Sequence, residues 1–320
     1  MLIMLKIFSS STSFFHSPIA RARLEAAGHR VTYRDGERPL SADELEPLVA
    51  GYDVIIAGLE PYNERILRAA LPTVRLVARV GAGYDNVDVA AAQRLGIPVT
   101  YTPGANAHAV AEHTLGILLA LARQIPAMDR TVKQGRWQKA IGCELYGKTL
   151  GIIGAGGIGL EVARRARAFG MKLLATNRSS RPAAALELGI RFVSLEELLR
   201  QADVVSLHCN SKRGAPPLID AQALALMKPS ALLVNTARGA LVDEAALFAA
   251  LSSQRIAGAA LDVFMHEPPT GSRLLGLDNV ILTPHTGASA HEAIERMSDM
   301  AVDEIFCLAA ARPFINQARS

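Results

Sequence analysis

A glycine-rich motif in the middle of the chain constrains its fold more than any other feature. The apolar segment LGII at 150–153 leads into GAGGIG at 154–159, a G-x-G-x-x-G pattern, and a helix is predicted over Leu160–Phe169. In such a unit the first glycine allows a tight turn, the second lets the backbone approach a pyrophosphate, and the third lets the helix pack closely on the strand. Helix N-terminal N–H groups then hold the phosphates. The motif predicts a dinucleotide site, and its expected contacts are Gly154, Gly156, Gly157, Ile158 and Gly159.

Apolar periodicity divides the rest of the chain into two series of alternating strands and helices. The strands predicted in the first series are Leu2–Phe8, Arg30–Tyr33, Asp53–Ala57, Leu76–Val80 and Pro98–Thr100. Those predicted in the second are Thr149–Ile153, Leu173–Thr176, Val204–His208, Leu232–Asn235, Ala259–Val263 and Val280–Leu282. Long helices are predicted between the series, over Asn106–Arg123 with Asn106 as N-cap, and after them, over about Ala290–Ala310. The alternation indicates an α/β protein with two doubly wound parallel-sheet domains.

Composition favours a small-molecule ligand over a macromolecular one. The net charge of +4 is small for 320 residues, and aromatic residues make up only 5% of the chain, so neither a basic nucleic-acid surface nor a stacking platform is expected. The most apolar later stretch, 107–122, contains His108, Glu112 and His113, too many polar groups for a membrane span. MLIMLKIF at the start has no basic residue before it, which favours a buried strand over a signal peptide.

Cysteine and histidine spacing argues against a metal site. Cys143, Cys209 and Cys307 are far apart and odd in number, which predicts neither a disulfide framework nor a zinc site and fits a reducing cytoplasm. The spacing of His108, His113 and His208 matches no zinc pattern, and we expect these side chains to make core or dimer contacts. We therefore expect a cytoplasmic protein without a metal.

The end of the second strand of the dinucleotide unit favours NADP(H). An acidic residue about 20 positions after the glycine motif usually accepts hydrogen bonds from the ribose of NAD. Here that place holds Asn177, followed by Arg178 and Ser179. Asparagine does not repel a 2′-phosphate, and arginine can bind one through two parallel hydrogen bonds. We expect these three residues to contact the cofactor and NADP to be favoured, with NAD possible; a solvated loop charge is the alternative explanation for Arg178.

Three polar residues follow predicted strands of the second series: Arg238, Glu267 and His285. Ligands bind at strand carboxyl ends in such sheets, so these side chains are candidates for one site. Arginine can bind a carboxylate through two bonds, histidine transfers protons near neutral pH, and a neighbouring carboxylate orients the ring and favours the imidazolium. An Arg–Glu surface pair and a loop-capping histidine remain alternatives at this point.

With these residues the chain resembles the D-isomer-specific 2-hydroxyacid dehydrogenases, close to the branch with 3-phosphoglycerate dehydrogenase and hydroxypyruvate reductase. The matching segments are VGAGYDNVD at 80–88, TPGANAHAVAEHTLG at 102–116, LGIIGAGGIG at 150–159, NTARGALVDEAAL at 235–247, AALDVFMHEP at 259–268 and TPHTGAS at 283–289. The resemblance implies a Rossmann cofactor domain, 104–285, inserted into a flavodoxin-like substrate domain made of 1–103 and 286–320. It also implies a homodimer formed largely by the cofactor domains.

The resemblance implies a role for each matching residue. Arg238 binds and polarises the substrate, His285 is the acid/base, and Glu267 stabilises the imidazolium, so replacing Glu267 should move the acidic limb of activity rather than abolish binding. The backbone of Val80, Gly81, Ala82 and Gly83 holds the substrate carboxylate. Asp262 bonds the nicotinamide carboxamide, and Thr236 and Ala237 line the cofactor. Asn106 lies beside the substrate, although a helix-capping role explains that residue almost as well.

Two departures from the family pattern bear on the substrate. The missing acidic residue after the second strand puts NAD use in doubt. The segment AGLEP at 57–61 has no basic residue for the phosphate of 3-phosphoglycerate, and Glu60 would repel a phosphate if it pointed inward, although Arg136, Lys139 and Lys148 are possible sources of charge. We therefore favour a reductase of a glyoxylate- or hydroxypyruvate-like 2-oxo acid. The first alternative is a 3-phosphoglycerate dehydrogenase. The second is a non-catalytic nucleotide-sensing module, and the intact Arg238, Glu267 and His285 argue against this second alternative.

Overall fold

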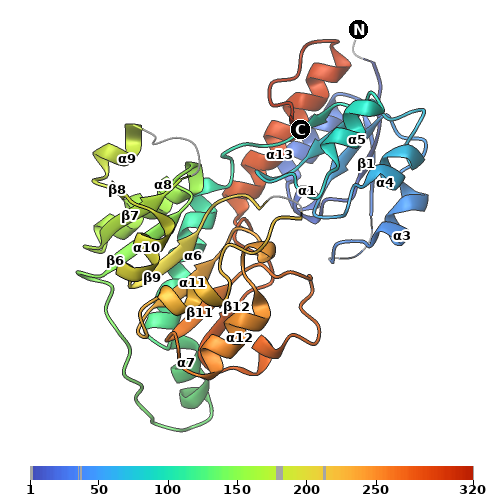
Figure 1. Cartoon of the computed structure of the whole chain (residues 1–320). Helices are drawn as coiled ribbons and strands as arrows, with labels where there is room; N and C mark the ends of the chain where they lie inside the picture. The colour runs from blue at the N-terminus through green and yellow to red at the C-terminus, as the bar shows by residue number, and fades with distance from the viewer. Residues whose placement is uncertain (1–2, 35, 37, 178–182, 212–213, 320) are drawn as a thin grey trace. The chain divides into compact units, whose positions relative to one another are not determined.

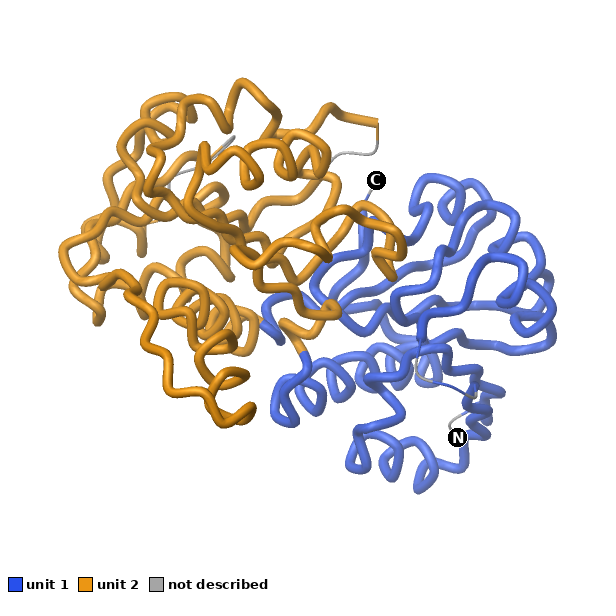
Figure 2. Tube along the Cα trace, turned by 90° about the horizontal axis from the view of Figure 1, so that it is seen from below, with its two compact units in different colours: residues 1–106, 289–320 blue, residues 107–288 orange. Residues whose placement is uncertain are grey.

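The computed structural model describes residues 3–34, 36, 38–177, 183–211 and 214–319 and divides into two compact units (Figure 1). Unit 1 contains residues 1–106 and 289–320, and unit 2 contains residues 107–288, so the second unit is inserted into the first (Figure 2). Unit 1 ends at residue 106 and resumes at residue 289. The sequence-based domain boundaries were 103 and 286.

Unit 1 is built on a five-stranded parallel sheet in the order β2-β1-β3-β4-β5. Its strands are β1 (Lys6–Ser9), β2 (Arg30–Tyr33), β3 (Val54–Ala57), β4 (Leu76–Arg79) and β5 (Val99–Thr100). This is the flavodoxin-like order, in which all strands are parallel and the order of the strands reverses between β1 and β3. All four residues of β3 and of β4 are buried, as expected for central strands of a parallel sheet covered on both faces.

The helices of unit 1 are α1 (Thr12–Phe15), α2 (Pro18–Ala26), α3 (Ala42–Leu45), the 3-10 turn η1 (Glu46–Leu48), α4 (Glu64–Ala69), α5 (Val89–Arg94) and α13 (His291–Ala309). The helices α1 to α5 begin at Ser, Asn or Asp residues whose side chains cap them, whereas α13 and the turn η1 have no side-chain cap. The Ser41–Glu44 capping box forms with both reciprocal bonds. α13 returns from the end of the chain and packs on α2 and β4, and Arg23 joins it by ion pairs of 2.9 Å to Asp299 and 2.7 Å to Asp303.

Unit 2 contains a seven-stranded parallel sheet in the order β12-β11-β10-β9-β6-β7-β8. Its strands are β6 (Thr149–Ile153), β7 (Lys172–Thr176), β8 (Arg191–Phe192), β9 (Val204–Leu207), β10 (Leu232–Asn235), β11 (Gly258–Leu261) and β12 (Val280–Leu282). Read from β8 to β11, this is the Rossmann order with one strand added at the far edge. The chain switches sides between β6 and β9, so the crevice expected for a ligand lies beside the glycine motif that follows β6.

Helices cover both faces of this sheet, and successive strand residues enter two different cores. They are α6 (Ala107–Ala122), α7 (Ile125–Lys133), α8 (Gly157–Ala168), α9 (Ala183–Glu187), α10 (Leu195–Gln201), α11 (Ala221–Leu226), α12 (Glu244–Ser252), η2 (Gly239–Leu241) and η3 (Arg273–Gly276). Leu233 of β10 packs with residues of α10 to α12, whereas its neighbour Val234 packs with residues of α6 and α8. This alternation is the physical basis of the β-strand pattern that the sequence shows.

The structure departs from the sequence expectations in local ways. The predicted α/β fold is confirmed, but the second sheet has seven strands rather than about six, because the two-residue edge strand β8 is too short to leave a periodic signal. The helix expected from Leu160 begins at Gly157, inside the glycine motif, and the first strand begins at Lys6 rather than Leu2. Within the described residues, no helix combines the length and apolar character that crossing a membrane requires.

Candidate active site

The glycine motif of unit 2 forms a turn whose shape fits a pyrophosphate. Gly154 has φ +100°, and a Cβ there would lie 2.7 Å from the backbone at the end of β9; one on Gly159 would lie 2.2 Å from the Gly154 carbonyl oxygen. A Cβ on Gly156 or Gly157 would meet nothing within 4 Å. Gly156 is the N-cap of α8 and offers no side-chain acceptor, so the first N–H groups of this helix are left uncapped. These residues can hold the phosphates of a dinucleotide.

Asn177 lies directly beside this turn. Its Oδ1 atom accepts a hydrogen bond of 2.6 Å from the Ala155 N–H, which ties the end of β7 to the glycine motif. No acidic residue stands in the described segments that directly follow β6, β7 and β9, that is 154–156, 177 and 208–211. Arg178 and Ser179, the other two residues expected to contact the adenosine end of the cofactor, lie outside the described residues.

The turn after β10 presents Arg238, and a residue that sequence analysis missed holds it. Asn235 is 1% exposed; its Oδ1 accepts from Ala237 N–H at 3.0 Å and its Nδ2 donates to the Arg238 carbonyl at 2.9 Å. Arg238 Nη1 donates to the Ala237 carbonyl at 2.7 Å, and Thr236 pairs its hydroxyl with that of Thr114 at 2.9 Å. The signal for Asn235 was available, because asparagine at a strand end commonly bonds the turn that follows.

The loops after β10 and β11 are in close contact. A Cβ on Gly239, next to Arg238, would overlap the backbone of Phe264 at 1.9 Å, so only glycine lets the two segments pass. The Phe264 N–H in turn donates to Glu267 Oε1 at 3.1 Å. The fold therefore sets the Arg238 turn directly against the loop that carries Glu267.

Glu267 and His285 form a hydrogen-bonded pair. His285 Nδ1 lies 2.7 Å from Glu267 Oε2, and both side chains are about 30% exposed, at 29% and 31%. Because a carboxylate only accepts, Nδ1 carries the hydrogen and Nε2 is left to exchange a proton with a ligand. His285 has φ +54°, an uncommon value outside glycine, and a bond of 2.8 Å from its N–H to the Asp262 carbonyl supports it.

Asp262 holds the loop that carries His285. Its buried carboxylate accepts from Thr283 Oγ1 at 2.6 Å, from Thr286 N–H at 2.8 Å and from Gly287 N–H at 2.8 Å, and His113 Nε2 lies 3.3 Å away. Burial by itself raises the pKa of Asp262, but the hydrogen bonds outweigh burial and hold that pKa below its ordinary value. Sequence analysis placed Asp262 at the nicotinamide; the structure adds that it orders the loop of His285 and recruits His113 to that task.

In unit 1 the turn after β4 leaves two N–H groups open. Val80 donates its N–H to the Ala57 carbonyl at 3.0 Å, and Gly81 donates to Thr102 Oγ1 at 2.9 Å. Among the described residues, the N–H groups of Ala82 and Gly83 have no acceptor. Of the four backbone groups expected to hold a carboxylate, these two are therefore free to do so.

Asn106 ends unit 1 immediately before α6. The residue is 9% exposed, and its Oδ1 has no hydrogen-bond partner in the part of the chain that the structure describes. A capping bond to α6 is therefore not made, and the expectation that Asn106 caps this helix is wrong. A buried acceptor without a partner is costly, which favours a role for this side chain in binding a ligand.

His108, His113 and His208 each contact an acidic or hydroxyl side chain. His108 lies 3.1 Å from Glu161, His113 contacts Thr283 at 3.1 Å, and His208 Nε2 lies 2.7 Å from Ser206 Oγ. In the described ranges, no three His, Cys, Asp or Glu side chains gather in a way that could hold a metal ion. The described cysteines, Cys143, Cys209 and Cys307, are all free thiols.

Comparison with known proteins assigns the chain to a family. A sequence model of the D-isomer specific 2-hydroxyacid dehydrogenase NAD binding domain matches residues 115–287. The glyoxylate reductase of Korarchaeum cryptofilum is 41% identical over 277 residues, which cover 84% of this chain and 83% of that protein. This chain belongs to the D-isomer-specific 2-hydroxyacid dehydrogenases. The glycine turn and the Glu267–His285 pair lie in the part matched by the NAD binding domain.

Two further comparisons involve proteins with other named activities. The D-3-phosphoglycerate dehydrogenase of Mycobacterium tuberculosis is 41% identical over 302 residues, which cover 94% of this chain but 57% of that protein. The chain thus spans a little over half the length of that relative. The solved structure of an acyclic imino acid reductase in complex with NADPH and D-Arg is similar to this chain, with a TM-score of 0.86 and 29% identity over 98% of this chain and 100% of that one.

Proposed function

We propose that this protein reduces a small 2-oxo acid to the D-2-hydroxy acid with NADPH. The observation that carries the proposal is the 2.7 Å pair between His285 and Glu267, beside the Arg238 turn and in the same unit as the glycine motif. A bound nicotinamide supplies the hydride to C2 of the substrate. The residues of the chain bind the acid, polarise its carbonyl and deliver the proton.

The proposed roles follow from the chemistry of each group. His285 donates the proton from Nε2 to the substrate C2 oxygen, while Glu267 accepts from Nδ1 and stabilises the imidazolium. Arg238 binds the substrate through its guanidinium and draws charge toward the reacting oxygen. In unit 1, the N–H groups of Ala82 and Gly83 hold the carboxylate, and the buried Oδ1 of Asn106 accepts a hydrogen bond from the hydroxyl of the 2-hydroxy acid product.

Unit 2 is proposed as the cofactor domain and unit 1 as the substrate domain. The turn at Gly154–Gly159 holds the pyrophosphate, Asn177 with Arg178 and Ser179 takes the adenosine end, and Thr236, Ala237 and Asp262 lie toward the nicotinamide. Preference for NADPH is supported by the neutral Asn177, by the absence of an acidic residue in the described segments 154–156, 177 and 208–211, and by the NADPH complex of the imino acid reductase.

The second candidate function is oxidation of 3-phosphoglycerate, favoured by the identity to the mycobacterial enzyme. The loop after β3 does not repel a phosphate through Glu60, because that carboxylate is buried and lies 3.7 Å from Arg34 Nε. It offers no basic side chain either, so a glyoxylate- or hydroxypyruvate-like acid remains the proposed substrate.

The decisive experiment is a matrix of initial rates. NADH and NADPH are each tested with glyoxylate, hydroxypyruvate, pyruvate and phenylpyruvate, and 3-phosphoglycerate is tested with both oxidised cofactors. A clear preference for NADPH with glyoxylate or hydroxypyruvate supports the proposal. Faster oxidation of 3-phosphoglycerate assigns the second function, and cofactor binding without any turnover identifies a nucleotide-sensing module instead.

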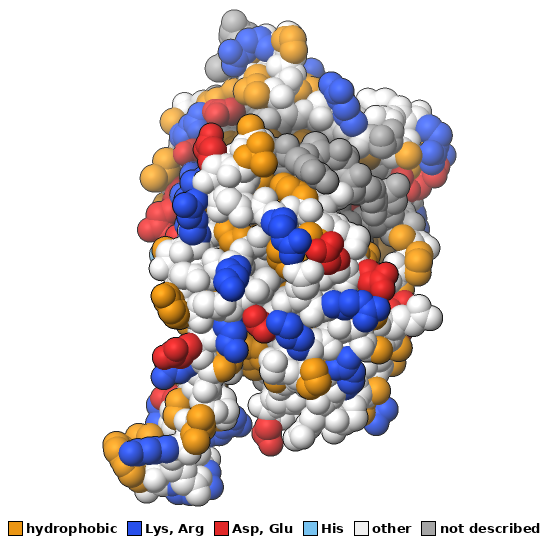
Figure 3. All heavy atoms as spheres, turned by 60° about the vertical axis from the view of Figure 1, so that its left-hand side comes forward, with side chains coloured by type: hydrophobic (Ala, Val, Ile, Leu, Met, Phe, Trp, Pro, Cys, Tyr) orange, Lys and Arg blue, Asp and Glu red, His pale blue; other side chains and the backbone are white. Residues whose placement is uncertain are grey.

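A homodimer formed through unit 2 is proposed from an exposed apolar segment. In α7 and the residues up to β6, five large apolar side chains lie in solvent: Ile125, Val132, Trp137, Ile141 and Tyr146. Trp137 is 84% exposed and Ile141 is 94% exposed. α7 and the chain that directly follows it lie at the lower end of unit 2 in Figure 1, and Figure 3 shows apolar and basic side chains gathered there. A second copy would cover such a surface.

Light scattering tests the proposed dimer. A dimeric mass that falls to monomeric in the Trp137→Asp, Ile141→Asp double variant supports the assignment, and a monomeric wild type contradicts it. A cytoplasmic location is also proposed, and cell fractionation tests it. The free thiols Cys143, Cys209 and Cys307 support residence in a reducing cytoplasm. Recovery in the membrane or secreted fraction would contradict that location.

A further inference from the structure

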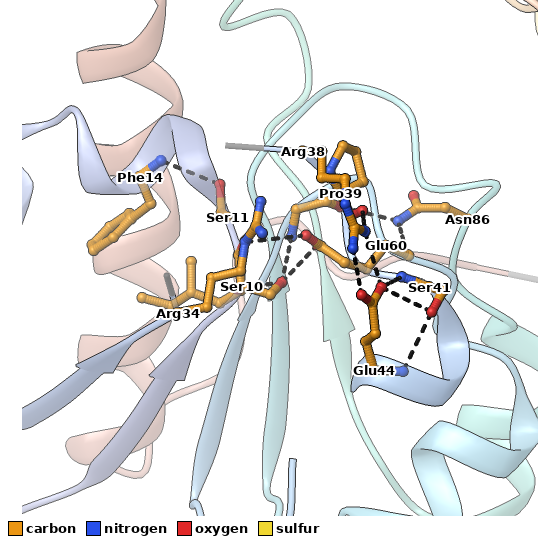
Figure 4. A network of polar contacts seen from close by, with 12 residues as sticks. Ser10, Ser11, Phe14, Arg34, Arg38, Pro39, Ser41, Glu44, Glu60 and Asn86 are labelled. Carbon is orange, nitrogen blue, oxygen red and sulfur yellow. Dashed lines mark hydrogen bonds and ion pairs between the residues drawn. The ribbon is translucent and has the colours of Figure 1, made fainter. Parts of the chain in front are cut away.

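A continuous polar network crosses the carboxyl end of the sheet in unit 1. Its members follow the strands in their spatial order, β2-β1-β3-β4-β5. They are Arg34, Ser10, Gly58 with Glu60, Asn86 with Arg79, and Thr102. Figure 4 shows the part from Arg34 to Asn86, with Glu60 between Arg34 and Ser10 on one side and Asn86 on the other. The network ends at the glycine turn after β4.

Glu60 is the buried centre of this network. Its side chain is 2% exposed, Ser10 Oγ donates to its Oε2 at 2.7 Å, and Arg34 Nε lies 3.7 Å from its Oε1. Since the carboxylate takes the only Ser10 hydroxyl hydrogen, the Tyr62 hydroxyl, 2.7 Å away, and the Gly58 N–H, 3.2 Å away, donate to Ser10. Burial, with the charge of Glu60, raises the pKa of Tyr62, so its hydroxyl keeps its hydrogen. The loop after β3 is thus fixed from within.

Asn86 joins this loop to the turn after β4. Its Nδ2 donates to the Gly58 carbonyl at 3.0 Å and to the Glu60 carbonyl at 2.8 Å, and its Oδ1 accepts from Arg79 Nε at 3.2 Å. All of the polar groups of this amide are therefore used in a single bridge between two loops. A residue that only filled space at this position would not need both donors and an acceptor.

Arg79 and Thr102 hold the glycine turn from two sides. Arg79 is 6% exposed, and its Nη1 donates to the Val80 carbonyl. A Cβ on Gly81, which has φ +148°, would lie 2.5 Å from that Nη1, so the guanidinium packs directly against the turn. Thr102 Oγ1 accepts from Gly81 N–H at 2.9 Å. Arg79 and Thr102 thus fix the turn, while the N–H groups of Ala82 and Gly83 have no acceptor among the described residues.

We propose that Asn86 is a positioning residue that acts through Arg79 to preorganise the N–H groups of Ala82 and Gly83 for the substrate carboxylate. The inference rests on the proposed function, in which this turn binds a 2-oxo acid. Donors fixed in advance bind an anion without an ordering cost. Every 2-oxo acid presents the same carboxylate. Loss of the Asn86 bridge therefore weakens the binding of all substrates to the same degree, whatever their side chain. A role in shaping the side-chain pocket would instead affect large and small substrates differently.

The test compares Asn86→Ala and Thr102→Val with the control Asn63→Ala. Asn63 caps α4 in the same unit by accepting from Ile66 N–H at 3.1 Å and takes no part in the network. In both network variants the KM for glyoxylate and for phenylpyruvate rises about tenfold, corresponding to the loss of a charge-assisted hydrogen bond. NADPH affinity, measured by fluorescence titration, stays within about twofold because the cofactor site is in unit 2. Asn63→Ala lowers the melting temperature but leaves both KM values unchanged.

The proposal is overturned if Asn86→Ala raises KM no more than Asn63→Ala does, or if its effect differs severalfold between glyoxylate and phenylpyruvate. Should Asn86→Ala fail to fold, Asn86→Ser, whose shorter side chain cannot bond both loops at once, is judged by the same criteria, and the nearly isosteric Thr102→Val tests the second support of the turn. If the wild type turns over neither acid, the proposed function fails, and calorimetric titration with oxalate in the presence of NADP takes over. Oxalate binding that both variants weaken about tenfold then supports the network role, and unchanged or undetectable binding refutes it.

Discussion

His285 Nδ1 lies 2.7 Å from Glu267 Oε2, while the other oxygen of that carboxylate accepts from the Phe264 N–H at 3.1 Å. One carboxylate therefore binds both the imidazole and the backbone of its own loop. The imidazole is fixed from the other side by the turn that Asp262 holds. Two acidic side chains thus determine where Nε2 of His285 points, and both belong to the same unit.

Replacing Glu267 by glutamine should shift the pH dependence of turnover. Glutamine keeps the hydrogen bond but removes the charge that favours the imidazolium, so protonated His285 is lost at lower pH. In reduction, which consumes this proton, the alkaline limb of kcat moves to lower pH; in oxidation, which needs neutral imidazole, the acidic limb does so. NADPH affinity stays unchanged.

Glu244→Gln is the matched control for this variant. Glu244 accepts from Met265 N–H at 2.8 Å, so it supports the same loop without touching His285. Steady-state rates between pH 5 and 10 separate the two variants. A Glu267→Gln profile that superimposes on the wild type after scaling would exclude the role assigned to this carboxylate.

Asn177→Asp should reverse the cofactor preference. The carboxylate still accepts from Ala155 N–H, so the turn is retained, but its charge repels a 2′-phosphate and it can accept from the ribose hydroxyls of NAD. We expect the ratio of kcat/KM for NADPH to that for NADH to fall by about tenfold or more. Asn63→Asp adds the same charge at a helix N-cap of unit 1 and should leave the ratio unchanged. An unaltered ratio in Asn177→Asp would mean that this side chain does not lie near the 2′ position.

Two glycines of the same turn should respond differently to alanine. At Gly156 a Cβ meets nothing within 4 Å, so Gly156→Ala retains stability but blocks the approach of the pyrophosphate, and NADPH affinity falls. At Gly159 a Cβ would lie 2.2 Å from the Gly154 carbonyl oxygen, so Gly159→Ala destabilises the fold by about 1–3 kcal/mol. Urea unfolding and cofactor titration distinguish the two effects. Unchanged NADPH affinity in Gly156→Ala would contradict the pyrophosphate assignment.

His208 should make the protein sensitive to mild acid. Burial lowers the pKa of His208 to about 3, and its Nδ1 has no partner among the described residues. The unfolded chain therefore takes up a proton near pH 6.5 that the folded protein does not, so stability is lost as the pH falls from there toward 3. Between pH 7 and pH 5 the wild type should lose about 1–2 kcal/mol more unfolding free energy than His208→Gln. His16→Gln, at an exposed site, is the control, and equal losses in all three proteins would contradict the prediction.

The local elements and the types of the site residues could be predicted from the sequence, whereas several of their contacts could not. The bounds of β2, β6, β10 and β12 agree with the prediction. β6, β10 and β12 are mostly apolar runs, and β2 alternates polar with β-branched or aromatic residues. The edge strand β8 was missed because two residues carry no period. Asn235 was also missed, although its place at a strand end indicates a bond to the turn that follows. His113 was missed because nothing near it in the sequence shows which loop it bonds.

The sequence by itself determined the α/β class, the glycine turn, the family and the three residue types that follow β10, β11 and β12, because these depend on patterns within a few neighbouring residues. Only the tertiary structure decided that Asp262 orders the His285 loop, that Asn106 leaves its Oδ1 without a bond among the described residues, and that the Glu60 carboxylate is buried beside Ser10 and Arg34. Such contacts join residues that are distant along the chain. They depend on how the strands align, and that alignment is a property of the whole fold rather than of any one segment.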